Sequence, residues 1–292
     1  PLDLGRRAVA DALIRALRAD VALYAYHAAA RTVRDSADLL NEFLPLEPLL
    51  GVLEYAHQRR NFDFDDAADT IERIADPVWR ERALGTAIGL GKHERAWLLS
   101  ENIHNVETAY ELGHLFDFVT RVFQFVEGAL RFLALDLGVQ FVDKRDRPNK
   151  DGEKIAPAWQ QQYQTLVEDM ARSGVDVAYG ANRTVLAAIA ERLCTRQDDA
   201  PRRQALEALK KLEQVGNLRN RVVHRYHAVT LALIRDTYYP SKRDRKRHPP
   251  EETAEEIIAV MKTVWSAVAG RPFAAANPYT AINQLILEIL NV

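Results

Sequence analysis

The residues best suited to chemistry lie between Leu218 and His227, a run that reads LRNRVVHRYH. Within it, Arg219, Asn220 and His224 supply a guanidinium, a carboxamide and an imidazole. An imidazole titrates near neutral pH and can deprotonate a 2′-hydroxyl. A guanidinium can stabilise the negative charge that gathers on a phosphate in a transition state, and an amide can orient either group by hydrogen bonds. This set therefore favours cleavage of RNA without a metal ion.

The motif is expected to lie in the middle of a helix that runs from about Arg202 to about Arg235. Asn220 and His224 are four residues apart and would share a face of that helix. Arg219 would lie about 140° around the helix from His224, but its long side chain can reach the same cleft. An apolar stripe predicts that the helix faces a core: Leu212, Val215, Val222, Tyr226, Val229 and Leu233.

The spacing of the polar residues resembles the R-N-x-x-x-H signature of HEPN ribonucleases (higher eukaryote and prokaryote nucleotide-binding domains). Arg219, Asn220 and His224 match all three fixed positions. The resemblance implies an all-α bundle that pairs as a homodimer, with two copies of the motif forming one composite active site. It also implies cleavage of single-stranded RNA that needs no metal or cofactor and leaves a 2′,3′-cyclic phosphate.

Within that family, the chain looks like the C-terminal two-thirds of the CRISPR type III accessory ribonucleases of the Csm group. The run from Asn61 to Ala68 resembles their helical linking domain, and Leu115 to Leu135 resembles their first HEPN helix. Those proteins sense cyclic oligoadenylate through an N-terminal CARF domain. The start at Pro1, without Met, favours a fragment or processed form. The resemblance thus implies antiviral defence with cyclic oligoadenylate activation through a domain that is absent from this chain.

Two other interpretations stay open. HEPN toxins of toxin–antitoxin pairs carry an R-x4-H-x-Y signature, which Arg219, His224 and Tyr226 also meet. In that family the Tyr can be nucleotidylated by the antitoxin. Such toxins are usually much shorter, which leaves the first part of the chain and the charged loop Asp143–Glu153 unexplained. The third interpretation is a non-catalytic all-helical interaction protein, because so short a motif also occurs by chance.

Basic and aromatic residues near the motif are candidate RNA contacts. Arg221, Arg225 and Tyr226 lie within the motif run, and Lys242 and Arg243 lie in a basic loop between Pro240 and Pro250. Cations in such positions can bind RNA phosphates. A solvated loop and a core or interface tyrosine are the plainer interpretations of the same residues.

A metal centre is the alternative that the sequence argues against. Three pairs have the Glu-x-x-His spacing of di-iron four-helix bundles: Glu54 and His57, Glu101 and His104, Glu111 and His114. The last two pairs would lie about 15 Å apart along one helix, too far to share metals about 4 Å apart. The helix expected from Leu4 to Arg34 contains no Glu to complete a site. We therefore predict surface or core histidines and no metal ion.

Composition limits the remaining classes. The formal net charge of −2 means that any nucleic-acid site must be local. Cys194 is the only cysteine, which excludes an intramolecular disulfide and fits a reducing cytoplasm. The most apolar stretch, Leu115 to Gly138, is interrupted by charged residues, so neither a membrane-spanning helix nor a membrane partner is expected.

Helical periodicity dominates and strand signals are nearly absent, which predicts an all-α protein. We expect a helical linking module over 1–110 and a HEPN-type bundle over 111–292. A long helix from Leu115 to Leu137 would open that bundle. It carries more phenylalanines than one buried face needs and would contribute to a homodimer interface: Phe116, Phe123, Phe125 and Phe132. Two short helices, Glu94–Leu99 and Asn102–Glu111, are expected just before it.

Overall fold

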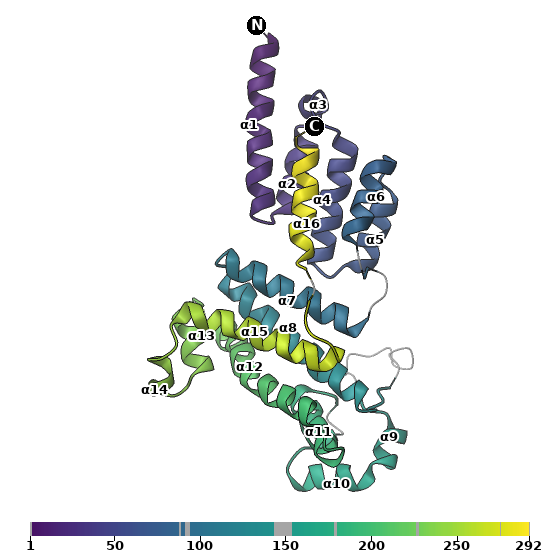
Figure 1. Ribbon diagram of the computed structural model, residues 1–292, viewed down its shortest axis with the longest axis vertical. Coiled ribbons are helices and arrows are strands. Elements are labelled where there is room, and N and C mark those ends of the chain that lie inside the picture. Colours follow the sequence, from purple (N-terminus) through teal and green to yellow (C-terminus); the bar gives the residue numbers. More distant parts are fainter. Residues whose placement is uncertain are drawn as a thin grey trace. The chain divides into compact units, whose positions relative to one another are not determined.

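The computed structural model describes residues 2–87, 89–90, 94–142, 154–177, 180–225, 228–274 and 276–291 (Figure 1). For residues 2–3 and 220–225 it describes the backbone alone. Across these ranges the chain forms sixteen helices, and its only β-type pairing is an isolated antiparallel bridge between Phe141 and Ile155. The all-α prediction is therefore confirmed. The charged loop expected at Asp143–Glu153 lies outside the described residues.

The chain folds into two compact units. The first comprises Pro1–Trp97 together with Ala275–Val292, and the second comprises Leu98–Ala274. The last helix thus packs with the N-terminal helices rather than with the bundle that precedes it in sequence. The chain passes from one compact unit to the other at residues 97–98 and again at 274–275. The division into a linking module (1–110) and a HEPN-type bundle (111–292) stays a prediction.

The first unit surrounds an apolar core with seven helices among its described residues. These are α1 (Leu2–Ala22), α2 (Tyr26–Asp35), α3 (Ala37–Leu40), α4 (Leu46–Arg60), α5 (Phe64–Glu72), α6 (Pro77–Thr86) and α16 (Pro278–Ile289). Buried side chains of α4 and α16, such as Leu49, Val52, Ile282 and Ile286, share one hydrophobic cluster. The Tyr26 hydroxyl donates to Asn283 at 2.7 Å and ties α2 to α16.

The prediction of a single helix from Leu4 to Arg34 is wrong, because the helical conformation is interrupted between α1 and α2. Tyr24 adopts a positive φ of 54°, which a helix cannot contain. Contacts distant in sequence hold this strained residue. Arg60 donates to the Tyr24 carbonyl at 2.7 Å, and the Tyr24 ring meets the rings of Tyr26 and Tyr279 edge-on. Tertiary packing therefore overrides the local helical periodicity.

The second unit is organised around one apolar helix, α8 (Leu115–Asp136), which begins where the sequence predicted. It is joined by α7 (Arg95–Glu111), α9 (Pro157–Gln162), α10 (Gln164–Arg172), α11 (Arg183–Arg196), α12 (Ala200–Arg225), α13 (Leu231–Tyr238), α14 (Lys242–Arg245) and α15 (Pro250–Ala269). Helices α11, α12 and α15 all pack against α8. Phe118, Val122, Phe125 and Leu133 of α8 are fully buried. Each such side chain stabilises the fold by roughly 1.5–3 kcal/mol relative to exposure.

Helix α7 is one continuous helix, so the two short helices expected over the same residues are wrong. Ser100 and Glu101, which lie between the two expected helices, are inside this helix and buried. Polar residues near one another suggest a turn when only neighbours are considered. Burial against other helices of the unit supplies the stabilisation that local sequence does not show.

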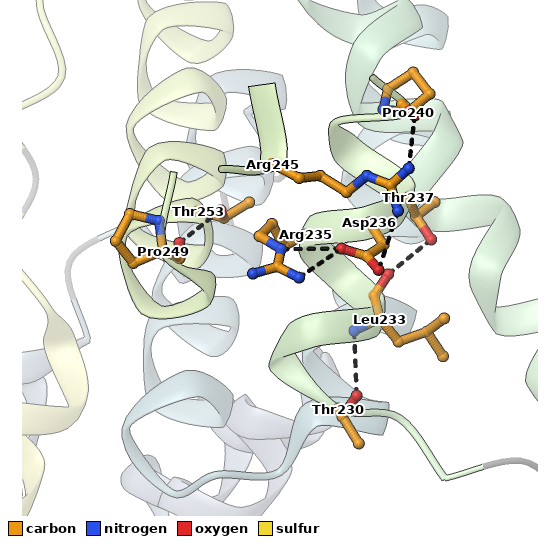
Figure 2. A network of polar contacts seen from close by, with 9 residues as sticks. All are labelled: Thr230, Leu233, Arg235, Asp236, Thr237, Pro240, Arg245, Pro249 and Thr253. Atoms are coloured by element: carbon orange, nitrogen blue, oxygen red, sulfur yellow. Dashed lines mark hydrogen bonds and ion pairs between the residues drawn. The ribbon is translucent and has the colours of Figure 1, made fainter. Parts of the chain in front are cut away.

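The motif helix also ends earlier than expected. Helix α12 stops at Arg225, and α13 starts afresh at Leu231, where the Thr230 hydroxyl accepts a hydrogen bond from the Leu233 N–H at 3.1 Å (Figure 2). A side-chain cap of this kind satisfies a free N–H at a helix start. The stripe from Leu212 to Leu233 therefore does not continue along one helix. In α13 the buried side chains are Ile234 and Tyr238 instead.

Candidate functional site

The R-N-x-x-x-H residues lie in the last two turns of α12 rather than in the middle of a helix. The backbone is helical through Arg225, so Asn220 and His224 share one face of α12. Their side chains, and those of Arg221 and Arg225, lie outside what the structure describes, as does the whole of Tyr226. The roles of these residues stay predictions.

Helix α12 approaches α8 unusually closely just before the motif. Leu209, Leu212 and Val215 of α12 are buried, and Gly216 faces the backbone of α8. A Cβ at position 216 would lie only 3.1 Å from the Cα of Phe123. Glycine thus permits this close packing. One turn further along α12, the side chain at position 219 emerges beside the Phe123 ring.

Arg219 is the one proposed catalytic residue whose side chain is described. Its guanidinium carbon lies 5.1 Å from the centroid of the Phe123 ring, a cation–π contact, and the side chain is half-buried. Among the described side chains, Arg219 forms no ion pair and no hydrogen bond.

A second arginine contacts the same ring. Arg183 begins α11, and its guanidinium carbon lies 4.4 Å from the Phe123 centroid. Arg183 Nη2 donates to Asn217 at 3.1 Å, and ion pairs of 3.7 and 3.8 Å link Arg183 to Glu127 of α8 and Glu213 of α12. These contacts join three helices at one side chain. Unlike Arg219, Arg183 is surrounded by carboxylate and amide oxygens.

These contacts indicate that α8 and α12 run in opposite directions. Glu127 and Glu213 meet the same arginine, whereas Phe123 meets Gly216. Moving along α12 toward position 224 therefore means moving along α8 toward its N-terminal end. Phe116, whose side chain is 44% exposed, lies at that end of α8. The sequence did not connect Arg183 or Phe123 with the motif, because no local pattern relates residues so far apart along the chain.

The basic loop expected at 240–250 contains the short helix α14, and Asp236 of α13 anchors it (Figure 2). Arg235 and Arg245 both contact the carboxylate of Asp236, Arg235 at 2.8 Å and Arg245 at 3.3 Å. Arg245 also donates to the Pro240 carbonyl at 3.0 Å. Hydrogen bonds from Arg235 hold the pKa of Asp236 below its ordinary value. Four other cations remain exposed: Lys242, Arg243, Lys246 and Arg247.

A second anchor ties the end of this segment to the motif helix. Glu256 of α15 accepts hydrogen bonds from Lys211 of α12 at 3.1 Å, from Tyr238 at 3.2 Å and from Tyr239. His248 stacks on the Tyr239 ring at 4.3 Å. Burial by itself would raise the pKa of Glu256, but these hydrogen bonds outweigh it and lower that pKa. The basic segment is thus fixed to the framework that carries Arg219.

The Glu-x-x-His pairs take other partners. His104 of α7 is buried, and its Nδ1 lies 3.0 Å from the carboxylate of Glu107, which also binds Lys262 of α15 at 2.7 Å. His57 contacts Asn61, and Glu54 pairs with Arg34. Among the described residues, no group of three or more His, Cys, Asp or Glu side chains is arranged to hold a metal ion.

The described helices include none that is both long and apolar enough to cross a membrane. Cys194 is buried within α11, and burial raises the pKa of its thiol. It therefore gives no sign of a reactive cysteine.

The fold has a counterpart among solved structures. The chain is similar to Enterococcus italicus Csm6 bound to cyclic hexa-2′-fluoro-hexa-dAMP, with a TM-score of 0.58 and 12% sequence identity. The similarity covers 96% of this chain and 57% of the Csm6 chain, so this protein spans little more than half the length of that neighbour. No family model and no curated protein matches the sequence. What the chain shares with Csm6 is therefore its fold, across both compact units.

Proposed function

We propose that this protein is a metal-independent endoribonuclease that cleaves single-stranded RNA with Arg219, Asn220 and His224. The observation that carries the proposal is the guanidinium of Arg219, which lies over Phe123 without a carboxylate partner among the described side chains. It occupies the end of a helix in an all-α chain whose fold resembles that of Csm6. In this proposal, Arg219 acts together with the imidazole of His224 and the amide of Asn220 on the charge that develops on a phosphate under attack.

The chemistry needs only these groups and the RNA. His224 takes the proton of the 2′-hydroxyl, and the 2′-oxygen forms a bond to the adjacent phosphorus. Arg219 stabilises the added negative charge, and Asn220 orients the imidazole or the phosphate by hydrogen bonds. The bond from phosphorus to the 5′-oxygen then breaks, and that oxygen takes a proton from a second copy of His224 or from water. The products are a 2′,3′-cyclic phosphate and a 5′-hydroxyl.

The active form in this proposal is a homodimer whose two α12 ends face one cleft. One helix end offers a single Arg, Asn and His, which hardly enclose a phosphate. A two-fold pair doubles the charge and is the commonest form of soluble oligomer. Of the phenylalanines expected at the interface, Phe125 is fully buried within its own unit, whereas Phe116 is exposed. Phe116 is thus the best placed of the four to meet a second subunit.

The biological setting that we favour is CRISPR type III antiviral defence in the cytoplasm. The similarity to Csm6 extends over 96% of this chain and so includes the N-terminal helices that the toxin interpretation leaves unexplained. The Csm6 structure contains a cyclic oligonucleotide. For this protein we infer activation by cyclic oligoadenylate through a domain outside the chain. Bound RNA would extend from the motif over Arg221 and Arg225 to Lys242 and Arg243.

A cleavage assay on a fluorescent single-stranded RNA, with and without EDTA, tests the activity. We expect cleavage that EDTA does not reduce, products that end in a 2′,3′-cyclic phosphate, and loss of cleavage in a folded His224→Ala variant. His27→Ala is the matched control, because His27 is an exposed histidine of α2, in the first unit. Full activity of His224→Ala would contradict the proposal, and dependence on a divalent ion would reopen the metal interpretation.

Light scattering and subunit mixing test the composite site. The wild-type protein should be a dimer at micromolar concentration. Adding excess His224→Ala subunits should reduce activity faster than the wild-type share of subunits falls, because mixed dimers hold only one histidine. A fully active monomer, or activity that follows the wild-type share alone, would contradict the shared cleft.

A further inference from the structure

Two guanidinium groups meet the ring of Phe123, and their surroundings differ. Arg183 lies 4.4 Å from the ring centroid and is tied to oxygens of Glu127, Glu213 and Asn217. Arg219 lies 5.1 Å from the same centroid, and the ring is its one contact of this kind among the described side chains. The first arginine is therefore held by charge and hydrogen bonds, and the second by an aromatic face.

We propose that Phe123 is the positioning residue for Arg219: its ring holds the guanidinium where the scissile phosphate binds, and Arg183 in turn fixes the ring. The inference rests on the proposed ribonuclease function and adds residues that the motif does not include. Phe123 acts through Arg219 and does not itself touch the reacting atoms.

An aromatic anchor suits an arginine that must act on a phosphate. The arginine side chain is long and loses much rotamer freedom when it is held in one place. A carboxylate would hold it firmly but would also neutralise the charge that the transition state needs. The face of a benzene ring attracts a cation through its quadrupole and leaves the hydrogen-bond donors at the guanidinium edge free. Phe123 can therefore orient Arg219 without using the hydrogen-bond donors of its guanidinium.

The ring is itself firmly placed. The Cα of Phe123 lies close to α12, and a Cβ at Gly216 would come within 3.1 Å of it. Arg183 packs on the ring, and its ties to α8 and α12 restrict its own movement. The negative charges of Glu127 and Glu213 also offset the charge of Arg183, which reduces its repulsion of Arg219. All of these contacts lie within the second unit.

Substitution of Phe123 provides the first test. Phe123→Leu keeps an apolar side chain but removes the ring face, and kcat for RNA cleavage should fall roughly tenfold or more with little change in KM. Phe123→Trp retains a ring face and should restore much of the rate, provided that it folds. Phe125→Leu is the matched control, because Phe125 is fully buried in the same helix. It should lower the melting temperature without lowering kcat in the folded protein.

Fluorinated phenylalanines give a test that does not depend on side-chain volume. Fluorine withdraws electron density from the ring face and weakens its attraction for a cation, with little change in size. At position 123, kcat should fall stepwise as one, two and three fluorines are introduced, while the same series at position 125 should leave kcat unchanged. A rate that is independent of fluorination at position 123, or a Phe123→Leu protein as active as wild type, would overturn the proposal.

Side-chain NMR separates this inference from the proposed function. Protons of Arg219 that lie over the ring should resonate upfield, at signals that disappear in Arg219→Ala and move to ordinary positions in Phe123→Leu. If the wild-type protein cleaves RNA but shows no such shift, the positioning role is overturned while the ribonuclease function stands. If the wild-type protein does not cleave RNA in any oligomeric state, the function is overturned and the positioning role falls with it.

Discussion

Two charged clusters in the second unit contain similar residues but differ in how their charges are paired. In the first, between α7 and α15, the carboxylate of Glu107 is bound by His104 at 3.0 Å and by Lys262 at 2.7 Å. Burial alone would raise the pKa of Glu107, yet these two hydrogen bonds outweigh it and hold that pKa below its ordinary value of 4.5. Here the carboxylate is bound by two side chains of its own unit.

The second cluster, at the contact between α8 and α12, is left unbalanced at one end. Arg183 has carboxylate partners, whereas Arg219 has only the ring of Phe123 among the described side chains. Removing one partner from a partly buried ion cluster is destabilising, because it leaves an unpaired charge. A cation without a partner adds little to stability but can bind an anion. The comparison predicts that the first cluster supports the fold and that the second contributes to the proposed RNA cleavage.

The largest expected effect separates the two clusters by activity. Arg219→Ala should reduce RNA cleavage by roughly 10²-fold or more, by analogy with removing a donor that stabilises an oxyanion. Its melting temperature should stay close to that of wild type, because Arg219 has no ion pair to lose among the described residues. Single-turnover cleavage and thermal melts measure the two quantities. A stable, fully active Arg219→Ala protein would remove the functional half of the comparison.

The next effect concerns stability. Glu107→Gln removes the charge that binds His104 and Lys262, and should lower the free energy of unfolding by about 1–3 kcal/mol. Cleavage by the folded protein should be unchanged. Glu252→Gln is a control for the loss of one acidic charge, because Glu252 is exposed. Urea unfolding gives the free energies. If the two variants were equally stable, the Glu107 cluster would not be the closed structural cluster described above.

The same cluster predicts a dependence on pH. The pKa of Glu107 is lowered in the folded protein, so the unfolded chain binds more protons as the pH falls. The stabilisation from Glu107 is therefore complete above its unfolded pKa, ordinarily 4.5, and is lost as the pH falls through the folded value. Urea unfolding should show the gap between wild type and Glu107→Gln to be widest near neutral pH and narrower in acid. A gap that widens in acid would reverse this sign.

The smallest expected effect tests the close packing beneath Arg219. Gly216→Ala gains helix propensity of about 1 kcal/mol, but its Cβ would lie 3.1 Å from the Cα of Phe123. Overpacking typically costs about 1–3 kcal/mol, so the net change in stability should be slight or mildly unfavourable. Because the backbone of α8 must shift, cleavage should fall several-fold. Gly85→Ala is the control, since nothing lies within 4 Å of a Cβ there. Unchanged cleavage would show that the exact spacing of the two helices is unimportant.

Helical periodicity in the sequence determined the all-α class and the bounds of several helices. The long apolar helix was expected over Leu115–Leu137 and is found over Leu115–Asp136. The shared face of Asn220 and His224 was also predictable, because it requires only that the backbone there be helical. These properties depend on residues within a few positions of one another. The identity of the site residues themselves stays a prediction.

Only the tertiary structure decided where other helices break or continue and what surrounds the motif. The chain breaks at Tyr24, remains helical through Ser100 and leaves α12 after Arg225, because distant contacts, burial or a new cap at Thr230 outweigh local preference. The contact of both Arg183 and Arg219 with the Phe123 ring is likewise a result of tertiary packing. Those arginines come from different helices and meet only because α11 and α12 both pack on α8. Sequence periodicity predicts which face of a helix a residue lies on. Which residue of another helix it contacts is decided by the packing of the helices.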